Sequence, residues 1–191
     1  TEVQSPDGHI KMTLTVDENG KPFYNVSVDD SLLIENSTMG FTAANGIILG
    51  EGFQVKNTTF SSEDETWTQP WGENKKNRNH YNEMAVNLTN EDHVQLTLRF
   101  RVFDDGIGFR YEYTVPTVDS LLITDELTTF RFHRDGTSWS IPASAETYEL
   151  LYQQQPISEV ETANTPFTFK TADGVYGSIH EAALYDFPEM T

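Results

Sequence analysis

Hydrophobic and polar residues alternate with a period of two along much of the chain, which is the pattern of half-buried β-strands. In residues 95–103, QLTLRFRVF, apolar side chains occupy every second position from Leu96 to Val102, and polar side chains occupy the positions between them. The alternation resumes over residues 107–115, after an Asp-Asp-Gly turn sequence at 104–106. Asp-Gly between two alternating runs is a strong hairpin signal, so this region is predicted to form a β-hairpin.

Shorter runs of the same kind occur elsewhere in the chain. Residues 10–16 and 23–28 alternate around the turn sequence at 17–20, which predicts a second hairpin near the N-terminus. Residues 120–133 and 175–184 offer short strands rich in β-branched or aromatic residues, separated by Gly, Pro and Asp. Many short antiparallel strands predict an all-β fold, a sandwich or a barrel.

Two segments depart from the alternating pattern. Residues 144–154, SAETYELLYQQ, are the best candidate for a short helix, although Tyr and Thr also suit strands. Residues 61–84 gather charge, Asn, Pro and Gly around Trp67 and Trp71. We interpret this segment as a long polar loop whose tryptophans pin it to the domain, because large aromatic residues are usually buried. The alternative is that they stack on sugar rings.

The amino-acid composition argues against some classes of binding partner and some kinds of metal site. A chain of 191 residues fits one domain, and 30 acidic against 12 basic residues give a net charge of −18. This charge repels nucleic acid and anionic membranes but suits neutral sugars or divalent cations. Without cysteine, no disulfide and no thiolate metal site can form. The sequence shows no membrane-spanning run and no signal-peptide pattern at its start, so any signal peptide is presumed removed.

The adjacent residues His180 and Glu181 are the strongest candidates in the sequence for catalytic or metal-binding side chains. A zinc-peptidase helix needs a second histidine four residues after the first, and Leu184 occupies that place. In a strand, adjacent side chains point to opposite faces, so only one of the pair could line a given site. Calcium takes about six to eight oxygen ligands, often from distant segments, so Glu181 could complete a site built mainly by another domain. The alternative is an ordinary solvent-facing glutamate.

Arginines alternate with the apolar positions of the predicted hairpin. Arg99, Arg101 and Arg110 share its polar face with Glu112, so cross-strand ion pairs of modest strength are predicted there.

Four segments in a fixed order resemble the N-terminal domain of glycoside hydrolase family 97, the bacterial α-glucosidases and α-galactosidases. They are TWTQPWGENKKNRNHYNEMAV (66–86), LRFRVFDDGIGFRYEY (98–113), ITDELTTFRF (123–132) and SIHEAALYDFPEM (178–190). The resemblance spans nearly the whole chain.

The resemblance implies an antiparallel β-super-sandwich of the galactose-mutarotase type, with residues 1–191 as a single N-terminal domain before a catalytic (β/α)8 barrel. In that family the catalytic carboxylates belong to the barrel, so no catalytic or sugar-binding residue is assigned here and the chain alone is expected to be inactive. A calcium ion beside them takes one carboxylate from the H-E-A-A-L motif, which corresponds to Glu181. The implied substrate is an α-linked oligosaccharide in the bacterial periplasm or outside the cell, glucoside or galactoside, hydrolysed with inversion or retention.

Two other functions remain open at this stage. The chain could be a free-standing carbohydrate-binding sandwich that uses Trp67 or Trp71 as a stacking platform. It could also be an enzyme resembling aldose-1-epimerase, which would need a His and a Glu from separate segments to converge in one cleft.

Overall fold

The computed structural model describes residues 1–44, 46–116 and 118–185. The chain forms two compact units, Thr1–Arg131 and Phe132–Thr191. In the described residues every strand pairing is antiparallel, and the single helical element is the 3-10 turn Ile157–Glu159. The predicted all-β class is therefore confirmed. The described part of the chain contains no helix with the length and apolar character needed to cross a membrane.

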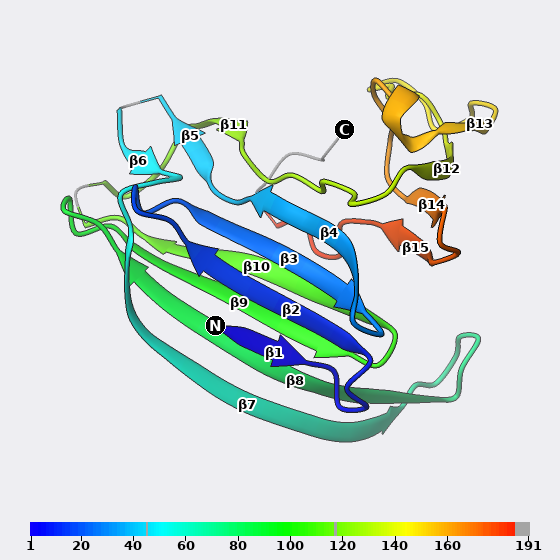
Figure 1. Ribbon diagram of the computed structural model, residues 1–191, viewed down its shortest axis with the longest axis horizontal. Helices are drawn as coiled ribbons and strands as arrows, with labels where there is room; N and C mark the ends of the chain where they lie inside the picture. Colours follow the sequence, from blue (N-terminus) through cyan, green and yellow to red (C-terminus); the bar gives the residue numbers. More distant parts are fainter. Residues whose placement is uncertain (45, 117, 186–191) are drawn as a thin grey trace. The chain divides into compact units, whose positions relative to one another are not determined.

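The first unit contains three sheets (Figure 1). The N-terminal sheet contains, in spatial order, β1 (Glu2–Gln4), β2 (Ile10–Val16), β3 (Pro22–Val28) and β4 (Ser31–Thr38). The long sheet contains, in spatial order, β10 (Gly106–Thr114), β9 (Gln95–Phe103), β8 (Lys76–Thr89) and β7 (Gln54–Thr68). The small sheet contains β11 (Ile123–Glu126), β5 (Phe41–Ala43) and β6 (Ile48–Leu49). Both predicted hairpins, β2–β3 and β9–β10, are confirmed.

The core of the first unit lies between the N-terminal sheet and the long sheet, with β1 contacting β8 and β2 contacting β9. Alternate residues of β9 point inward, and Leu96, Leu98, Phe100 and Val102 have no exposed surface. From the opposite sheet, Met12 is equally buried. Because side chains alternate between the two faces of a strand, the period of two in the sequence places this apolar set in the sandwich interior.

The interpretation of residues 61–84 as a long loop is wrong. Residues 61–68 and 76–84 belong to β7 and β8, which pair without interruption from Asn57↔Asn87 to Thr68↔Lys76, and only residues 69–75 form the turn between them. Charged and amide side chains link the two strands, including Arg78, which binds both carboxylate oxygens of Asp64 at 2.7 and 2.8 Å. Most of β7 is exposed, so its sequence lacks the alternation that a buried face would impose.

The second unit contains one sheet. Its strands, in spatial order, are β13 (Gln153–Pro156), β12 (Gly136–Ser140), β14 (Phe167–Thr171) and β15 (Tyr176–Ile179). Phe169 is buried, and its ring centroid lies 4.6 Å from that of Phe132. This small aromatic contact forms the centre of the unit's core.

Three other segments correct the sequence prediction. The helix predicted over residues 144–154 is absent, since residues 144–152 form no regular element and β13 begins at Gln153. Its apolar side chains gave no helical stripe, and Leu151 is 90% exposed. Within residues 120–133 only β11 forms. The strand predicted over 175–184 is confirmed for β15 alone.

Candidate functional site

The β14–β15 hairpin carries the segment that contains Glu181. Its turn is held by Thr171, whose backbone N–H donates to the carbonyl of Val175 at 2.9 Å. The N–H of Val175 donates back to Thr171 Oγ1 at 3.2 Å, and Thr171 Oγ1 donates to Asp173 at 2.6 Å. The hairpin therefore fixes the strand that leads directly to the H-E-A-A-L motif.

Glu181 lies two residues beyond the end of β15. The last pair of the ladder joins Ile179 to Phe167, and Pro166 precedes Phe167. The missing N–H of Pro166 does not interrupt this ladder, because the hydrogen-bonded 171–175 pair sets a register in which even-numbered residues of β14 direct their backbone groups away from β15. His180 is exposed and Glu181 is half-buried. The two side chains differ in exposure, but neither belongs to the strand, so the prediction of opposite strand faces does not apply to them.

A close approach between Gly177 and Phe169 sets the position of β15. A Cβ atom built on Gly177 would lie 2.4 Å from the Phe169 ring, which is shorter than any normal contact.

We therefore expect Gly177→Ala to displace β15 and to destabilise the second unit by about 1–2 kcal/mol, the usual cost of overpacking. Hydrogen exchange of the β14–β15 amides measures this effect, which should include faster exchange in β15. Gly174→Ala is not a matched control because Gly174 has a positive φ of 95°. Thr168→Ser, on the same hairpin, should leave exchange unchanged, and an equal effect of both variants would contradict the packing argument.

The side chains that the structure brings together determine which metal sites this part of the chain can form by itself. Among the described residues, no group of three or more His, Asp or Glu side chains lies close enough to hold a metal ion. The carboxylate of Glu181 is a hard oxygen donor of the type that calcium prefers. Glu181 therefore has the chemistry of one calcium ligand, and the described residues bring no set of three such side chains together beside it.

The two tryptophans considered for sugar stacking lie at one end of the β7–β8 hairpin. Trp67 is in β7 and Trp71 is in the turn that follows it, where it is 86% exposed. The prediction that these residues pin a loop to the domain is wrong for Trp71, because its side chain is almost entirely in solvent.

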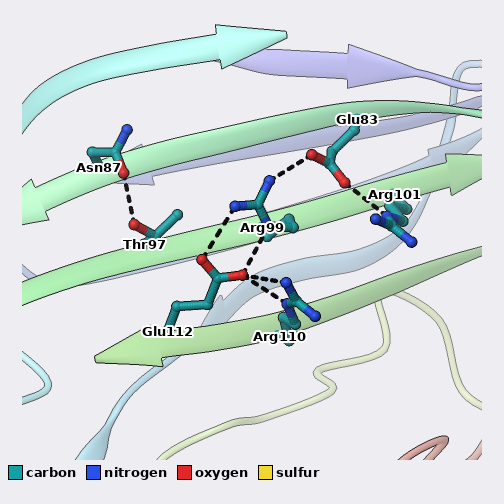
Figure 2. Close-up of polar contacts among 7 residues, drawn as sticks. All are labelled: Glu83, Asn87, Thr97, Arg99, Arg101, Arg110 and Glu112. Atoms are coloured by element: carbon teal, nitrogen blue, oxygen red, sulfur yellow. Dashed lines mark hydrogen bonds and ion pairs between the residues drawn. The ribbon is translucent and has the colours of Figure 1, made fainter. Parts of the chain in front are cut away.

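A set of five charged residues, here called the arginine ladder, crosses three strands of the long sheet on its outer face (Figure 2). The ladder consists of Glu83, Arg99, Arg101, Arg110 and Glu112. Arg99 donates to Glu83 at 2.5 Å and to both oxygens of Glu112 at 2.9 and 3.1 Å. Arg101 donates to the other oxygen of Glu83 at 2.7 Å. At the opposite end of the ladder, Arg110 Nε donates to Glu112 at 2.7 Å.

The predicted pairing of Arg99 and Arg110 with Glu112 is confirmed, whereas Arg101 pairs with Glu83. Glu83 escaped the sequence argument because it lies on β8, inside the segment interpreted as a loop. Its side chain is only 10% exposed. Burial alone would raise the pKa of Glu83, but hydrogen bonds from Arg101 and Arg99 outweigh burial and lower it.

Hydrogen bonds from Arg99 are the main reason that the pKa of Glu112 falls from 4.5 to about 2. Burial acts in the opposite direction, and a hydrogen bond from Arg110 lowers the pKa further. A carboxyl group with a lowered pKa in the folded state stabilises the fold above its unfolded pKa. We therefore expect this contribution to be complete above about pH 4.5 and to decline as the pH falls towards about 2. Urea denaturation at several pH values measures this decline, which should be smaller in Glu112→Gln. An identical pH dependence in the variant would contradict the assignment.

The second unit also has an open basin of about 780 Å³, lined by residues that include His133, Arg134, Asp135 and Lys170. Asp135 is already engaged, because it accepts hydrogen bonds from Ser158 Oγ at 2.7 Å and from the N–H of Ser158 at 3.1 Å. These bonds lower the pKa of Asp135. No glutamate lines the basin, so this cleft does not supply the His and Glu pair that an epimerase would need.

Comparison with known proteins decides the family. The family described as "Glycosyl-hydrolase 97 N-terminal" matches residues 3–191. The chain belongs to glycoside hydrolase family 97. Within this family, its matched region is the N-terminal one, as the four sequence segments predicted.

Solved structures of a Glycoside Hydrolase Family 97 enzyme from Pseudoalteromonas sp. strain K8 are similar over 100% of this chain, with 37% identity and a TM-score of 0.91. They include complexes of that enzyme with panose and with acarbose. A retaining alpha-galactosidase of Bacteroides thetaiotaomicron is 25% identical over 201 residues. The chain corresponds to 30% of the Pseudoalteromonas enzyme and to 29% of the Bacteroides enzyme.

Proposed function

We propose that this family 97 domain is a non-catalytic component of an α-glycosidase and donates the Glu181 carboxylate to a calcium ion at the active site. The observation that carries the proposal is the placement of Glu181. It is half-buried and lies two residues beyond the end of β15, in the segment that follows the hairpin held by Gly177 and the Thr171 turn.

The role of the domain follows from the properties of one carboxylate. Glu181 would hold and orient the ion, while the domain surface around the β14–β15 hairpin would help to shape the substrate cleft. When bound, calcium supplies positive charge that stabilises negative charge developing on a reacting oxygen. No residue of the described chain is assigned a step in bond cleavage.

The whole protein is proposed to contain a catalytic (β/α)8 barrel after a single N-terminal domain that includes both compact units. Its proposed substrate is an α-linked oligosaccharide, and its proposed location is the bacterial periplasm or the cell exterior. The panose and acarbose complexes of the Pseudoalteromonas enzyme and the activity of the Bacteroides galactosidase support this substrate class. The net charge of −18 suits a neutral substrate.

The proposal is tested by Glu181→Gln in the full-length enzyme. Replacing a charged ligand by an amide should weaken calcium binding by at least about ten- to a hundredfold, the range seen for groups that support a metal site. Calorimetric calcium titration measures the affinity, and activity should be partly restored at high calcium concentration. Glu149→Gln, at an exposed position of the same unit, should bind calcium normally. Unchanged calcium affinity in Glu181→Gln would refute the proposed ligand.

The exposure of Trp71 favours one second candidate, a carbohydrate-binding role of the β7–β8 hairpin. Stacking of a sugar on this ring would give saturable heat on titration with maltooligosaccharides or galactosides, and the signal would disappear in Trp71→Ala. Because the hairpin belongs to the first unit and Glu181 to the second, the two roles are separable by mutation.

A further inference from the structure

The free edge of the long sheet is formed by β7. This strand is the last one of its sheet, and among the described residues it pairs only with β8. It runs along the rim of the sheet, as Figure 1 shows, and all of its residues except Thr58 are exposed. A long exposed edge presents a row of free backbone groups, which makes it a template for pairing with another strand.

The outward backbone groups of β7 belong to its even-numbered residues. The N–H of Gln69 donates to the carbonyl of Lys75 across the hairpin at 3.2 Å, so Gln69 is directed at the opposite strand. This orientation alternates along an antiparallel ladder, so the odd-numbered residues from Asn57 onward bond to β8. The residues whose N–H and C=O groups point to the open edge are therefore Thr58, Phe60, Ser62, Asp64 and Thr66. No hydrogen bond among the described residues reaches these groups.

Phe60 adds an apolar side chain to this edge. It is opposite Met84, which is fully buried, and directly opposite residues of a ladder share a face. The N-terminal sheet does not cover this part of the face, because Phe60 is 61% exposed and lines an open groove of about 590 Å³. A strand added beside β7 would therefore meet an exposed aromatic ring as well as free backbone groups.

β7 is complementary to a second copy of itself. We propose that two copies of this chain pair through their β7 strands, antiparallel and related by a two-fold axis at Phe60, so that their long sheets become one continuous sheet. Even-numbered residues would bond to even-numbered residues, because only these direct their backbone groups outward. Phe60 would lie opposite Phe60 of the second copy, and Thr58 opposite Ser62, which is the self-complementary pattern of a two-fold interface.

The charges of β7 favour this register. Its acidic residues occupy positions 63–65. With the axis at Phe60, these positions lie beside residues 55–57 of the second copy, which are Val55, Lys56 and Asn57. Each acidic residue then meets an apolar, basic or amide side chain. An axis at residue 63 or 64 would instead place acidic residues opposite one another, which is destabilising.

This inference goes beyond the proposed function and does not depend on calcium binding or on Glu181. Because the pairing takes two molecules, dilution returns the monomer, in which Phe60 is exposed as described.

The first test is disulfide cross-linking in the full-length protein. Residues 1–191 contain no cysteine, so Phe60→Cys introduces one thiol into this region, and peptide mass spectrometry identifies the disulfide that joins two copies of it. Thr66→Cys is the matched control, because Thr66 is exposed and lies on the same face of β7. Its two copies would lie roughly 40 Å apart in the proposed register, at about 3.3 Å per residue. We expect Phe60→Cys to cross-link at least about tenfold faster than Thr66→Cys, since only its thiols come within disulfide reach.

The second test is analytical ultracentrifugation of the full-length protein. The net charge of −18 on residues 1–191 opposes association, so the buffer needs about 0.15 M salt or more. We expect dimers at roughly 100 μM, a concentration that populates even weak complexes. Ser62→Pro removes an N–H from the open edge and leaves the bonds to β8 in place, so association should weaken at least about tenfold. Thr68→Pro is the control, because Thr68 lies beyond the paired region and its loss should leave association unchanged.

Three results would overturn the proposal. A protein that stays monomeric at this concentration does not pair through β7. A dimer that Ser62→Pro leaves intact uses another surface. Equal cross-linking rates of Phe60→Cys and Thr66→Cys would show collisions between molecules in place of the proposed register.

Discussion

Phe100→Ala is expected to lower the free energy of unfolding of the first unit by about 3–5 kcal/mol, the usual cost of truncating a buried phenylalanine. Phe100 has no exposed surface, lies in the centre of β9, and its ring centroid is 6.1 Å from that of Phe109. Its removal would leave a cavity between two sheets whose neighbouring side chains are held by their strands. Urea denaturation followed by circular dichroism measures the change.

The same sheet provides a matched control for this truncation. Met84 of β8 is paired with Phe100 on one side and with Phe60 on the other. Phe60→Ala removes the same atoms from a side chain that is 61% exposed, so the expected loss is under about 1 kcal/mol in the isolated 191-residue chain. Equal losses for the two variants would mean that the interior of the sandwich is not packed as described.

Arg99→Met is expected to destabilise the first unit by about 2–4 kcal/mol, because it removes one of the two cations that compensate the largely buried carboxylate of Glu83. Arg99 is the central residue of the arginine ladder and binds both Glu83 and Glu112. After the substitution, Glu83 would keep only Arg101 while remaining 10% exposed. Thermal denaturation at neutral pH measures the loss.

Arg110→Met is the control within the same ladder. Arg110 is 66% exposed and binds Glu112, so its loss should cost at most about 1 kcal/mol, as for other surface ion pairs. If Arg99→Met were no more destabilising than Arg110→Met, the ladder would be a surface feature without a buried centre.

The sequence predicted the parts of the fold in which one face of a strand is buried. In β9 the apolar residues from Leu96 to Val102 alternate with polar ones, and the structure buries all four of them. The hairpin turn is equally local in sequence, although Asp104 and Asp105 form it, and Gly106 begins β10 without a positive φ. Both features follow from short-range rules.

Sequence patterns did not predict strands that are mostly exposed and are held in place by pairing with a neighbouring strand. Most of β7 is exposed, so the segment from 61 onward looked like a loop, yet it pairs along its length with β8. Glu83 was missed for the same reason. The helix predicted over 144–154 rested on local propensity, which tertiary context overrides readily.

The candidate site was only partly predictable. Sequence reasoning excluded a zinc peptidase from Leu184 and left Glu181 as a possible single ligand, and the family resemblance gave that ligand a role. The end of β15 at Ile179 is visible only once β14 and β15 are paired, because no local turn or breaker residue marks it in the sequence. A ligand set supplied by another part of a protein leaves no pattern in these 191 residues.

The central claim is that Glu181 is a calcium ligand, and a crystal structure of the full-length enzyme grown with calcium tests it most directly. We predict a carboxylate oxygen of Glu181 at about 2.3–2.6 Å from the ion, the normal calcium–oxygen distance. A calcium ion whose coordination is complete without Glu181 would contradict the claim. A calcium ion found only at the protein surface, away from Glu181, would contradict it as well.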